Sequence, residues 1–175
     1  MKRLIVDGYN VLHAHPAYAA LAARDLDSAR ARLVADLAGL AQGGPRVVVV
    51  FDGGGNPASD GTPHHLGALT VIFSRSGETA DTLIESLAAR SRDRGEDAVV
   101  ITSDAATRQA VVGGGISVLS SANFLDVLDD DATDRSESRR AGVRRVPVDE
   151  RIGADVREDL AAWARGRPPS PGDGR

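Results

Sequence analysis

The sequence predicts an α/β protein with a mainly parallel sheet, and two observations support this. Short runs of apolar, β-branched residues alternate with longer segments in which apolar residues recur at helical spacing. The run at 46–51, Arg-Val-Val-Val-Val-Phe, lacks alternating polar residues, as expected for a strand that helices cover on both faces. Strands that alternate with helices in this way form βαβ units and therefore a parallel sheet.

The elements follow in order from these patterns. Helix-breaking residues mark several boundaries, because Gly43-Gly44-Pro45 and Gly113-Gly114-Gly115 each end a helical segment. The predicted strands are 3–7, 46–51, 68–73, 98–102 and 116–119. The predicted helices are 26–41, 78–92, 104–112, 122–128 and 148–164. The segment 52–67 is rich in Gly, Pro, Ser and His and is predicted to be a loop.

The composition changes after Leu128 and divides the chain into three parts. Residues 1–128 form the predicted α/β domain. Residues 129–165 hold an acidic and then Arg-rich linker followed by the predicted last helix. Residues 166–175 contain three prolines and three glycines and little that can pack, so we expect a disordered tail.

The composition also excludes several classes of site. The chain of 175 residues has no cysteine, which excludes disulfides, Cys-ligated metals and a thiol nucleophile. Lys2 is the only lysine, so a P-loop or a catalytic lysine elsewhere is excluded. The net charge of −4 means that nucleic-acid binding would need a local basic patch. No apolar run is long enough to span a membrane, and we expect a cytoplasmic protein without membrane partners.

Carboxylates follow the predicted strands at their carboxyl ends, where open parallel sheets bind ligands. Asp7, Asp52 and Asp104 come at or just after the ends of three strands, and Glu78 and Asp81 open the helix after a fourth. Each alone is as readily explained as a helix cap, a turn former or a solvated acid. Together they would repel one another unless protons or a cation intervene. Oxygen ligands without Cys or His suit Mg²⁺ or Mn²⁺, which can activate water and offset phosphate charge.

Two polar residues accompany these carboxylates. The Asn10 amide can bond a carboxylate, a water molecule or a phosphate oxygen, or it can cap a helix or loop. Ser103 can orient Asp104 or contact phosphate, or it can be an ordinary turn serine.

Four segments, in this order, resemble the YacP-like NYN ribonucleases, a PIN-like family. They are Asp7-Gly-Tyr-Asn10, Phe51-Asp-Gly53, Ser-Gly-Glu-Thr-Ala-Asp at 76–81 and Thr102-Ser-Asp104. The resemblance covers residues 3 to about 128. It implies a PIN-like three-layer sandwich with a five-stranded sheet in the order 3-2-1-4-5, and metal-dependent endoribonuclease activity. Some members of the family are linked to translating ribosomes and to cleavage of messenger RNA there.

The resemblance also assigns site residues. It implies a catalytic set of Asp7, Asn10, Asp81 and Asp104, and a Mg²⁺ or Mn²⁺ site of Asp7, Asp81, Asp104, Asp52 and Glu78.

Arginines supply candidate contacts to RNA phosphates, because the guanidinium fork matches phosphate oxygens. Arg139, Arg140, Arg144 and Arg145 either bind RNA or offset the acidic run at 129–134. Arg75 lies just before the helix that carries Asp81, so it is better placed to contact an RNA phosphate at the site than any one of these four arginines.

The leading hypothesis is therefore a metal-dependent endoribonuclease whose partners are RNA and, by resemblance, the ribosome. The alternative is a non-catalytic RNA- or ribosome-binding module with the same fold. A small-molecule phosphatase is disfavoured because Asp7 is followed by Gly8 and Tyr9 rather than by an Asp-x-Asp pair. The sequence leaves the oligomeric state open.

Overall fold

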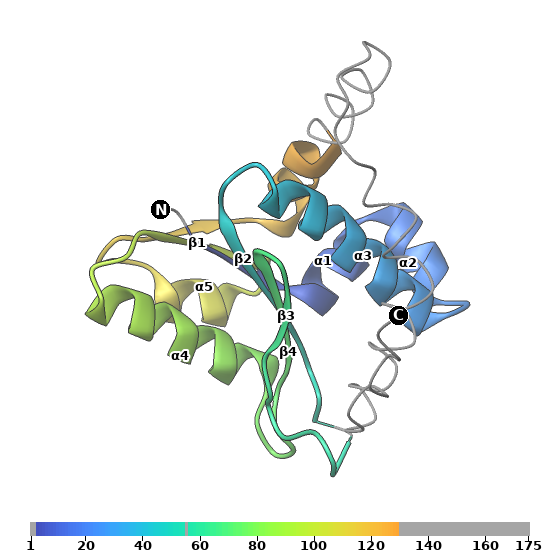
Figure 1. Ribbon diagram of the computed structural model, residues 1–175, viewed down its shortest axis with the longest axis horizontal. Helices are drawn as coiled ribbons and strands as arrows, with labels where there is room; N and C mark the ends of the chain where they lie inside the picture. The colour runs from blue at the N-terminus through green and yellow to red at the C-terminus, as the bar shows by residue number, and fades with distance from the viewer. Residues whose placement is uncertain (1–2, 55, 130–175) are drawn as a thin grey trace, which may run out of the picture.

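A computed structural model describes residues 3–54 and 56–129 and shows one six-stranded sheet with helices on both faces (Figure 1). The strand order is β3-β4-β2-β1-β5-β6, and every pairing is parallel except that of β3 with β4. The strands are β1 (Arg3–Asp7), β2 (Arg46–Phe51), β3 (His64–Leu66), β4 (Leu69–Phe73), β5 (Ala98–Ile101) and β6 (Ile116–Leu119). The helices are α1 (Gly8–Ala14), α2 (Pro16–Ala22), α3 (Leu26–Ala41), α4 (Ala80–Asp93), α5 (Ala105–Val111) and a helix at 121–129.

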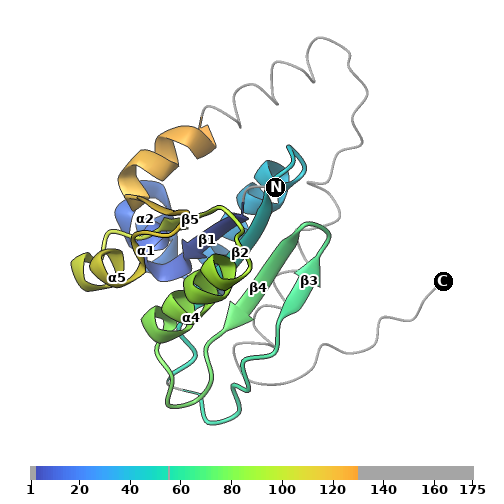
Figure 2. The same ribbon diagram turned by 90° about the vertical axis from the view of Figure 1, so that its left-hand side faces the viewer.

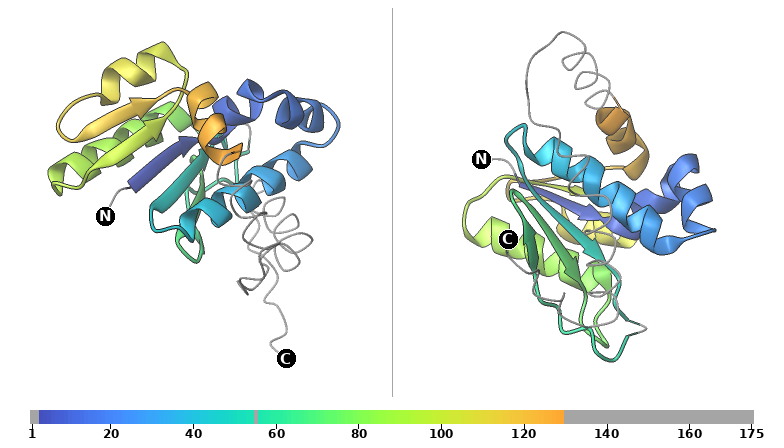
Figure 3. Two further views of the ribbon diagram at one scale, coloured as in Figure 1. Left: turned by 90° about the horizontal axis from the view of Figure 1, so that it is seen from above. Right: turned by 45° about the vertical axis from the view of Figure 1, so that its right-hand side comes forward.

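The molecule has three layers, because each face of the sheet is covered by its own set of helices (Figure 3). Helices α1, α2, α3 and the helix at 121–129 pack on one face, and α4 and α5 pack on the other. Strand β2 contributes to both cores, with Val47 and Val49 on one side and Val48 and Val50 on the other. The prediction that the run at 46–51 is buried on both faces is confirmed.

The five predicted strands correspond to β4-β2-β1-β5-β6 and have the predicted order, but the sheet has one more strand. Figure 2 shows β3 beside β4 at the edge of the sheet. The prediction of a loop throughout 52–67 was therefore wrong at its end. Leu66 and Leu69 are paired across a tight turn, and Gly67 adopts the φ of +63° that such a turn favours.

The helices next to Asp7 and Asp81 also differ from the prediction. Residues 8–22, for which no helix was predicted, form α1 and α2, whose N-caps are Asp7 and His15. Helix α4 begins at Ala80 rather than at residue 78, because the Thr79 hydroxyl accepts a hydrogen bond from the Thr82 N–H and caps the helix there. Glu78 therefore lies in the turn before the helix.

The predicted linker and last helix within 129–165, the tail at 166–175 and the four arginines of the linker lie outside the described residues, apart from Asp129. Within 3–54 and 56–129, no helix has the length and apolar character needed to cross a membrane.

Candidate functional site

The parallel register brings the ends of three central strands to one edge of the sheet. Asp7 pairs with Val50 in β2, and Val6 pairs with Ile101 in β5. Asp7, Asp52 and Asp104 therefore leave the sheet along the same edge, as the sequence predicted. Asp81 joins them from the first turn of α4.

Asp7 is the most buried of these carboxylates, with an exposed fraction of 6%. It is the N-cap of α1, and its Oδ1 accepts a hydrogen bond of 3.1 Å from the Asn10 N–H. Its Oδ2 accepts a hydrogen bond of 3.4 Å from the Thr102 hydroxyl, so Asp7 joins the end of β1 to the segment that follows β5.

Burial raises the pKa of the Asp7 carboxyl above its usual value, and repulsion from the Asp81 carboxylate raises this pKa further. Hydrogen bonds from Asn10 and Thr102 act in the opposite direction without cancelling the effect. The fold thus holds a carboxylate where its charged form is disfavoured. A bound cation or proton would relieve this unfavourable interaction.

Thr107 links the other two carboxylates. Its hydroxyl donates a hydrogen bond of 2.8 Å to Asp81 Oδ1, and its backbone N–H donates one of 2.8 Å to Asp104 Oδ1. The Asp104 N–H in turn donates to the Thr102 hydroxyl at 3.1 Å. Asp7, Asp81 and Asp104, the carboxylate cluster, are therefore joined through two threonines.

Asp104 differs electrostatically from Asp7. It is the N-cap of α5, and the hydrogen bond from the Thr107 backbone N–H lowers the pKa of the Asp104 carboxyl. One member of the cluster is thus stabilised in its charged form, while Asp7 is not.

Asn10 and Ser103 form a second polar group beside the cluster. The Asn10 Oδ1 accepts hydrogen bonds from the Ser103 N–H at 3.2 Å and from the Ser121 hydroxyl at 3.5 Å. The Ser103 hydroxyl accepts from the Ser121 N–H at 3.1 Å, which leaves the hydroxyl proton of Ser103 able to donate elsewhere. Ser103 is exposed, so this proton can reach a ligand.

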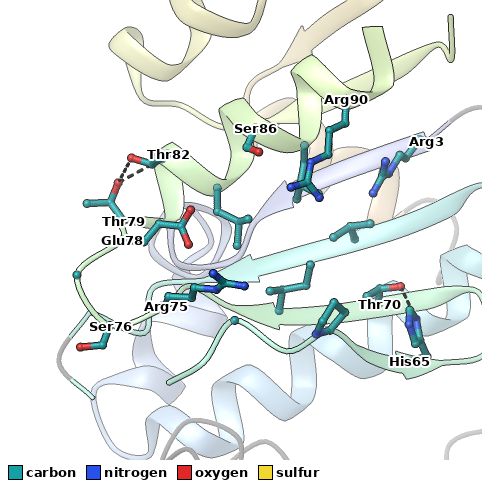
Figure 4. A pocket seen from close by; sticks show the side chains of 17 residues that line it. Arg3, His65, Thr70, Arg75, Ser76, Glu78, Thr79, Thr82, Ser86 and Arg90 are labelled. Carbon is teal, nitrogen blue, oxygen red and sulfur yellow. Dashed lines mark hydrogen bonds between the residues drawn. The ribbon is translucent and has the colours of Figure 1, made fainter. Parts of the chain in front are cut away.

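Among the described residues, no hydrogen bond joins Asp52, Glu78 or Arg75 to the carboxylate cluster. Asp52 is exposed and accepts a hydrogen bond of 2.6 Å from the Gly54 N–H in its own turn. Glu78 and Arg75 line one end of a groove between α4 and the β3–β4 hairpin (Figure 4). Arg75 is held there because its Nε donates a hydrogen bond of 3.0 Å to the carbonyl of Asp60.

Three residues that join the site were not identified from the sequence: Thr102, Thr107 and Ser121. All three are fully or almost fully buried. The spacing of Asp104 and Thr107 matches a helix cap and its third following residue, which predicts their backbone bond. No such local pattern predicts that the same threonine reaches Asp81, which is 26 residues away in the chain.

Over 3–54 and 56–129, no three His, Asp or Glu side chains converge as a preformed metal-binding group. The donor chemistry nonetheless fits a hard divalent cation, because the carboxylate cluster offers only oxygen atoms. Asp81 is exposed, and the only hydrogen bond it accepts from the described residues comes from Thr107.

Comparison with known proteins agrees with this architecture. The family model of the YacP-like NYN domain matches residues 4–165. The chain belongs to the YacP-like NYN domain family. NYN domains are typically ribonucleases, so the family places the chain among nuclease-like proteins.

Relatives of this NYN chain include protein YacP of Bacillus subtilis (strain 168), which is 31% identical over 174 residues, covering 95% of this chain and 98% of that protein. The crystal structure of Rae1 (YacP) from Bacillus subtilis matches with a TM-score of 0.69 at 29% identity, covering 95% of this chain and 96% of that one. A tryptophan-to-leucine mutant of Rae1 matches with a TM-score of 0.65 at 29% identity, covering 91% and 98% of the two chains.

Proposed function

We propose that this NYN protein is a divalent-metal-dependent endoribonuclease that hydrolyses phosphodiester bonds within RNA. The observation that carries the proposal is the linkage of Asp7, Asp81 and Asp104 through Thr102 and Thr107 at the carboxyl edge of the sheet. Family membership supports the same class of chemistry.

In this proposal Asp7, Asp81 and Asp104 hold Mg²⁺ or Mn²⁺. Such an ion, when bound, supplies positive charge for the reacting phosphate and acidifies water. The raised pKa of Asp7 is consistent with this role, because a carboxylate with a disfavoured charge gains from a neighbouring cation. The Thr107 hydroxyl fixes one oxygen of Asp81, which limits how far that exposed side chain can turn.

Asn10 and Ser103 are proposed to position the substrate. The loop after β5 and the helix at 121–129 hold the Asn10 amide through Ser103 and Ser121. The Ser103 hydroxyl can then donate to a phosphate oxygen next to the carboxylate cluster. Within this substrate class, the family resemblance favours messenger RNA on cytoplasmic ribosomes.

The experiment that tests the proposal compares Asp81→Asn with Asp93→Asn. Both changes neutralise an exposed carboxylate on α4, but Asp93 lies at the far end of the helix from the cluster. Cleavage is followed on RNAs labelled at either end, in Mg²⁺, in Mn²⁺ and with a chelator. We expect the wild type and Asp93→Asn to produce internal cuts only with metal, and Asp81→Asn to lose this activity.

Two outcomes would overturn the proposal in different ways. Full cleavage by Asp81→Asn would show that the carboxylate cluster does not take part in the reaction. Tight RNA binding by the wild type without cleavage in either metal would favour the non-catalytic RNA- or ribosome-binding module.

A further inference from the structure

A groove runs between α4 and the β3–β4 hairpin, on the face of the sheet that carries α4 (Figure 4). Helix α4 packs on β1, β2, β5 and β6, so the hairpin extends past the helix, and no other described helix covers this part of the sheet. The hollow measures about 810 Å³. Apolar side chains line it at Val48, Ile72, Leu83 and Leu87.

The groove continues along the sheet towards its amino-terminal edge. A second hollow of about 580 Å³ shares Arg3, Val48, His65 and Thr70 with the first. Together the two hollows extend from Arg75, beyond the carboxyl end of β4, to the opposite edge of the sheet.

Five arginines line this path, which we name the arginine groove: Arg3, Arg46, Arg75, Arg90 and Arg94. Figure 4 shows Arg90 from α4 and Arg3 from β1 at one end, with Arg75 and Glu78 at the other. The acidic residues lining the path are Glu78 and Glu96. The lining is therefore positive, although the whole chain has a net charge of −4.

These positive charges are only partly compensated. Within the described part of the chain, none of the five arginines forms an ion pair within 4.0 Å. Burial lowers the pKa of the Arg3 guanidinium, and repulsion from Arg94, Arg46 and Arg90 lowers it further, while Glu96 opposes the change. An anion in the groove would relieve this repulsion.

We propose that the arginine groove binds the sugar–phosphate backbone of a single-stranded RNA segment that flanks the carboxylate cluster. This rests on the proposed function for its substrate class. Positive grooves that follow the backbone are the usual means of binding single strands, and arginine is well suited to phosphate oxygens. From the level of Phe73 to that of Leu69, strand β4 rises about 13 Å, which leaves room for more than one phosphate.

The geometry also favours a single strand over a duplex. The groove has an apolar lining, against which unpaired bases can pack. The lining contains no Phe, Tyr or Trp, so the arginines would make most of the contacts, to phosphates, and such contacts tolerate many base sequences.

The test compares two double variants of equal charge change. Arg46→Gln with Arg90→Gln alters exposed arginines of the groove. Arg24→Gln with Arg32→Gln alters exposed arginines beside and within α3, on the other face of the sheet. Binding of a labelled single-stranded RNA is measured by fluorescence anisotropy over a series of salt concentrations, with a chelator present so that no cleavage occurs.

The groove variant is expected to bind more weakly and to lose about 1.4 from the slope of log affinity against log salt, since each phosphate contact to a single strand contributes about 0.7. The control should keep the wild-type slope. Equal behaviour of the two variants would overturn the proposal, and so would a wild type that does not bind the RNA.

A cleavage assay on the same proteins separates this proposal from the proposed function. A protein that binds RNA through the groove but never cuts it supports the groove and refutes the nuclease. If the proteins cleave RNA and the two double variants bind it equally well, the proposal of the arginine groove is refuted and the proposed function is not.

Discussion

The role of Thr107 can be tested because one hydroxyl performs it. Thr107 is 1% exposed, and its hydroxyl donates to Asp81 Oδ1 at 2.8 Å. Thr107→Val removes this donor, keeps the side-chain shape and retains the N–H that bonds Asp104. A hydrogen bond to a charged group typically contributes about 1.5–3 kcal/mol to stability. Asp81 is exposed, so water can replace the hydroxyl, and we expect a cost of about 1 kcal/mol.

Activity should fall more than stability does. Without the hydroxyl, Asp81 can turn away from Asp7 and Asp104, and the loss of such supporting bonds at metal sites typically costs 10–100-fold, so we expect about tenfold slower cleavage. Thr107→Ser is the matched variant, because it keeps the hydroxyl and removes the buried methyl group. It should cost about 1 kcal/mol, or about 2–4 °C in Tm, but retain cleavage.

The assay pairs initial cleavage rates in saturating Mg²⁺ with thermal melts of both variants. The reasoning predicts similar losses of stability with opposite effects on activity. Wild-type cleavage by Thr107→Val would refute it, as would a loss of activity in Thr107→Ser as large as that in Thr107→Val.

Two further predictions concern the first turn of α1. Asp7→Asn should raise the Tm in metal-free buffer at pH 7, because Asn caps helices as well as Asp and carries no buried charge beside Asp81. The folded-state pKa of Asp7 is raised, so the wild type loses stability as the pH rises through that pKa. The stability advantage of Asp7→Asn should therefore shrink when the solution is acidified. A Tm difference between variant and wild type that stays constant from pH 4 to pH 8 would contradict this. Gly8→Ala should destabilise the fold by about 1–3 kcal/mol in denaturant titrations, because the new methyl group would overlap the buried ring of Phe51; an unchanged midpoint would show that the ring moves at no cost.

The order of the central strands was predictable because βαβ units restrict both direction and handedness. The run at 46–51 shows its burial on both faces directly in the sequence. Edge strand β3 was not predictable in this way, since three residues with two histidines have no clear alternation. It forms because the turn at Gly67 returns the chain onto β4 and because the His65 ring bonds the Thr70 hydroxyl.

The paired helices α1 and α2 were missed for a different reason. Each has only seven residues, and several of these are alanines, so neither shows a long apolar stripe. Their caps are local signals, with Asp7 before α1 and His15-Pro16 before α2. The buried Arg30 depends on this arrangement, because it donates to the Tyr9 hydroxyl and pairs with Asp27.

The shared edge of the candidate site's carboxylates was predictable from their positions after strands, but the connections between them were not. Asp7, Asp81 and Asp104 were identified because the carboxyl ends of parallel strands share an edge. Thr102 and Thr107 connect them by side-chain bonds between distant segments, and the sequence contains no periodic signal for such bonds. The Asp52 carboxylate bonds the Gly54 N–H of its own turn, whereas at Glu78 it is the backbone carbonyl that accepts a hydrogen bond from the Ser74 hydroxyl.

Strand β1 carries one residue of the carboxylate cluster, Asp7, and one residue of the arginine groove, Arg3. Arg3 and Asp7 are four residues apart in a strand, so they point to the same face, and the buried Ile5 between them packs under α4. They lie about 13 Å apart along the strand, and neither side chain is among the main groups that shift the pKa of the other. Each charge instead faces charges of its own sign. Asp7 is repelled by Asp81, and Arg3 is repelled by Arg94, Arg46 and Arg90. Their separation suits the RNA substrate that we propose: the arginine groove would hold its phosphates, while the proposed cation at the carboxylate cluster would offset the charge of the reacting phosphate.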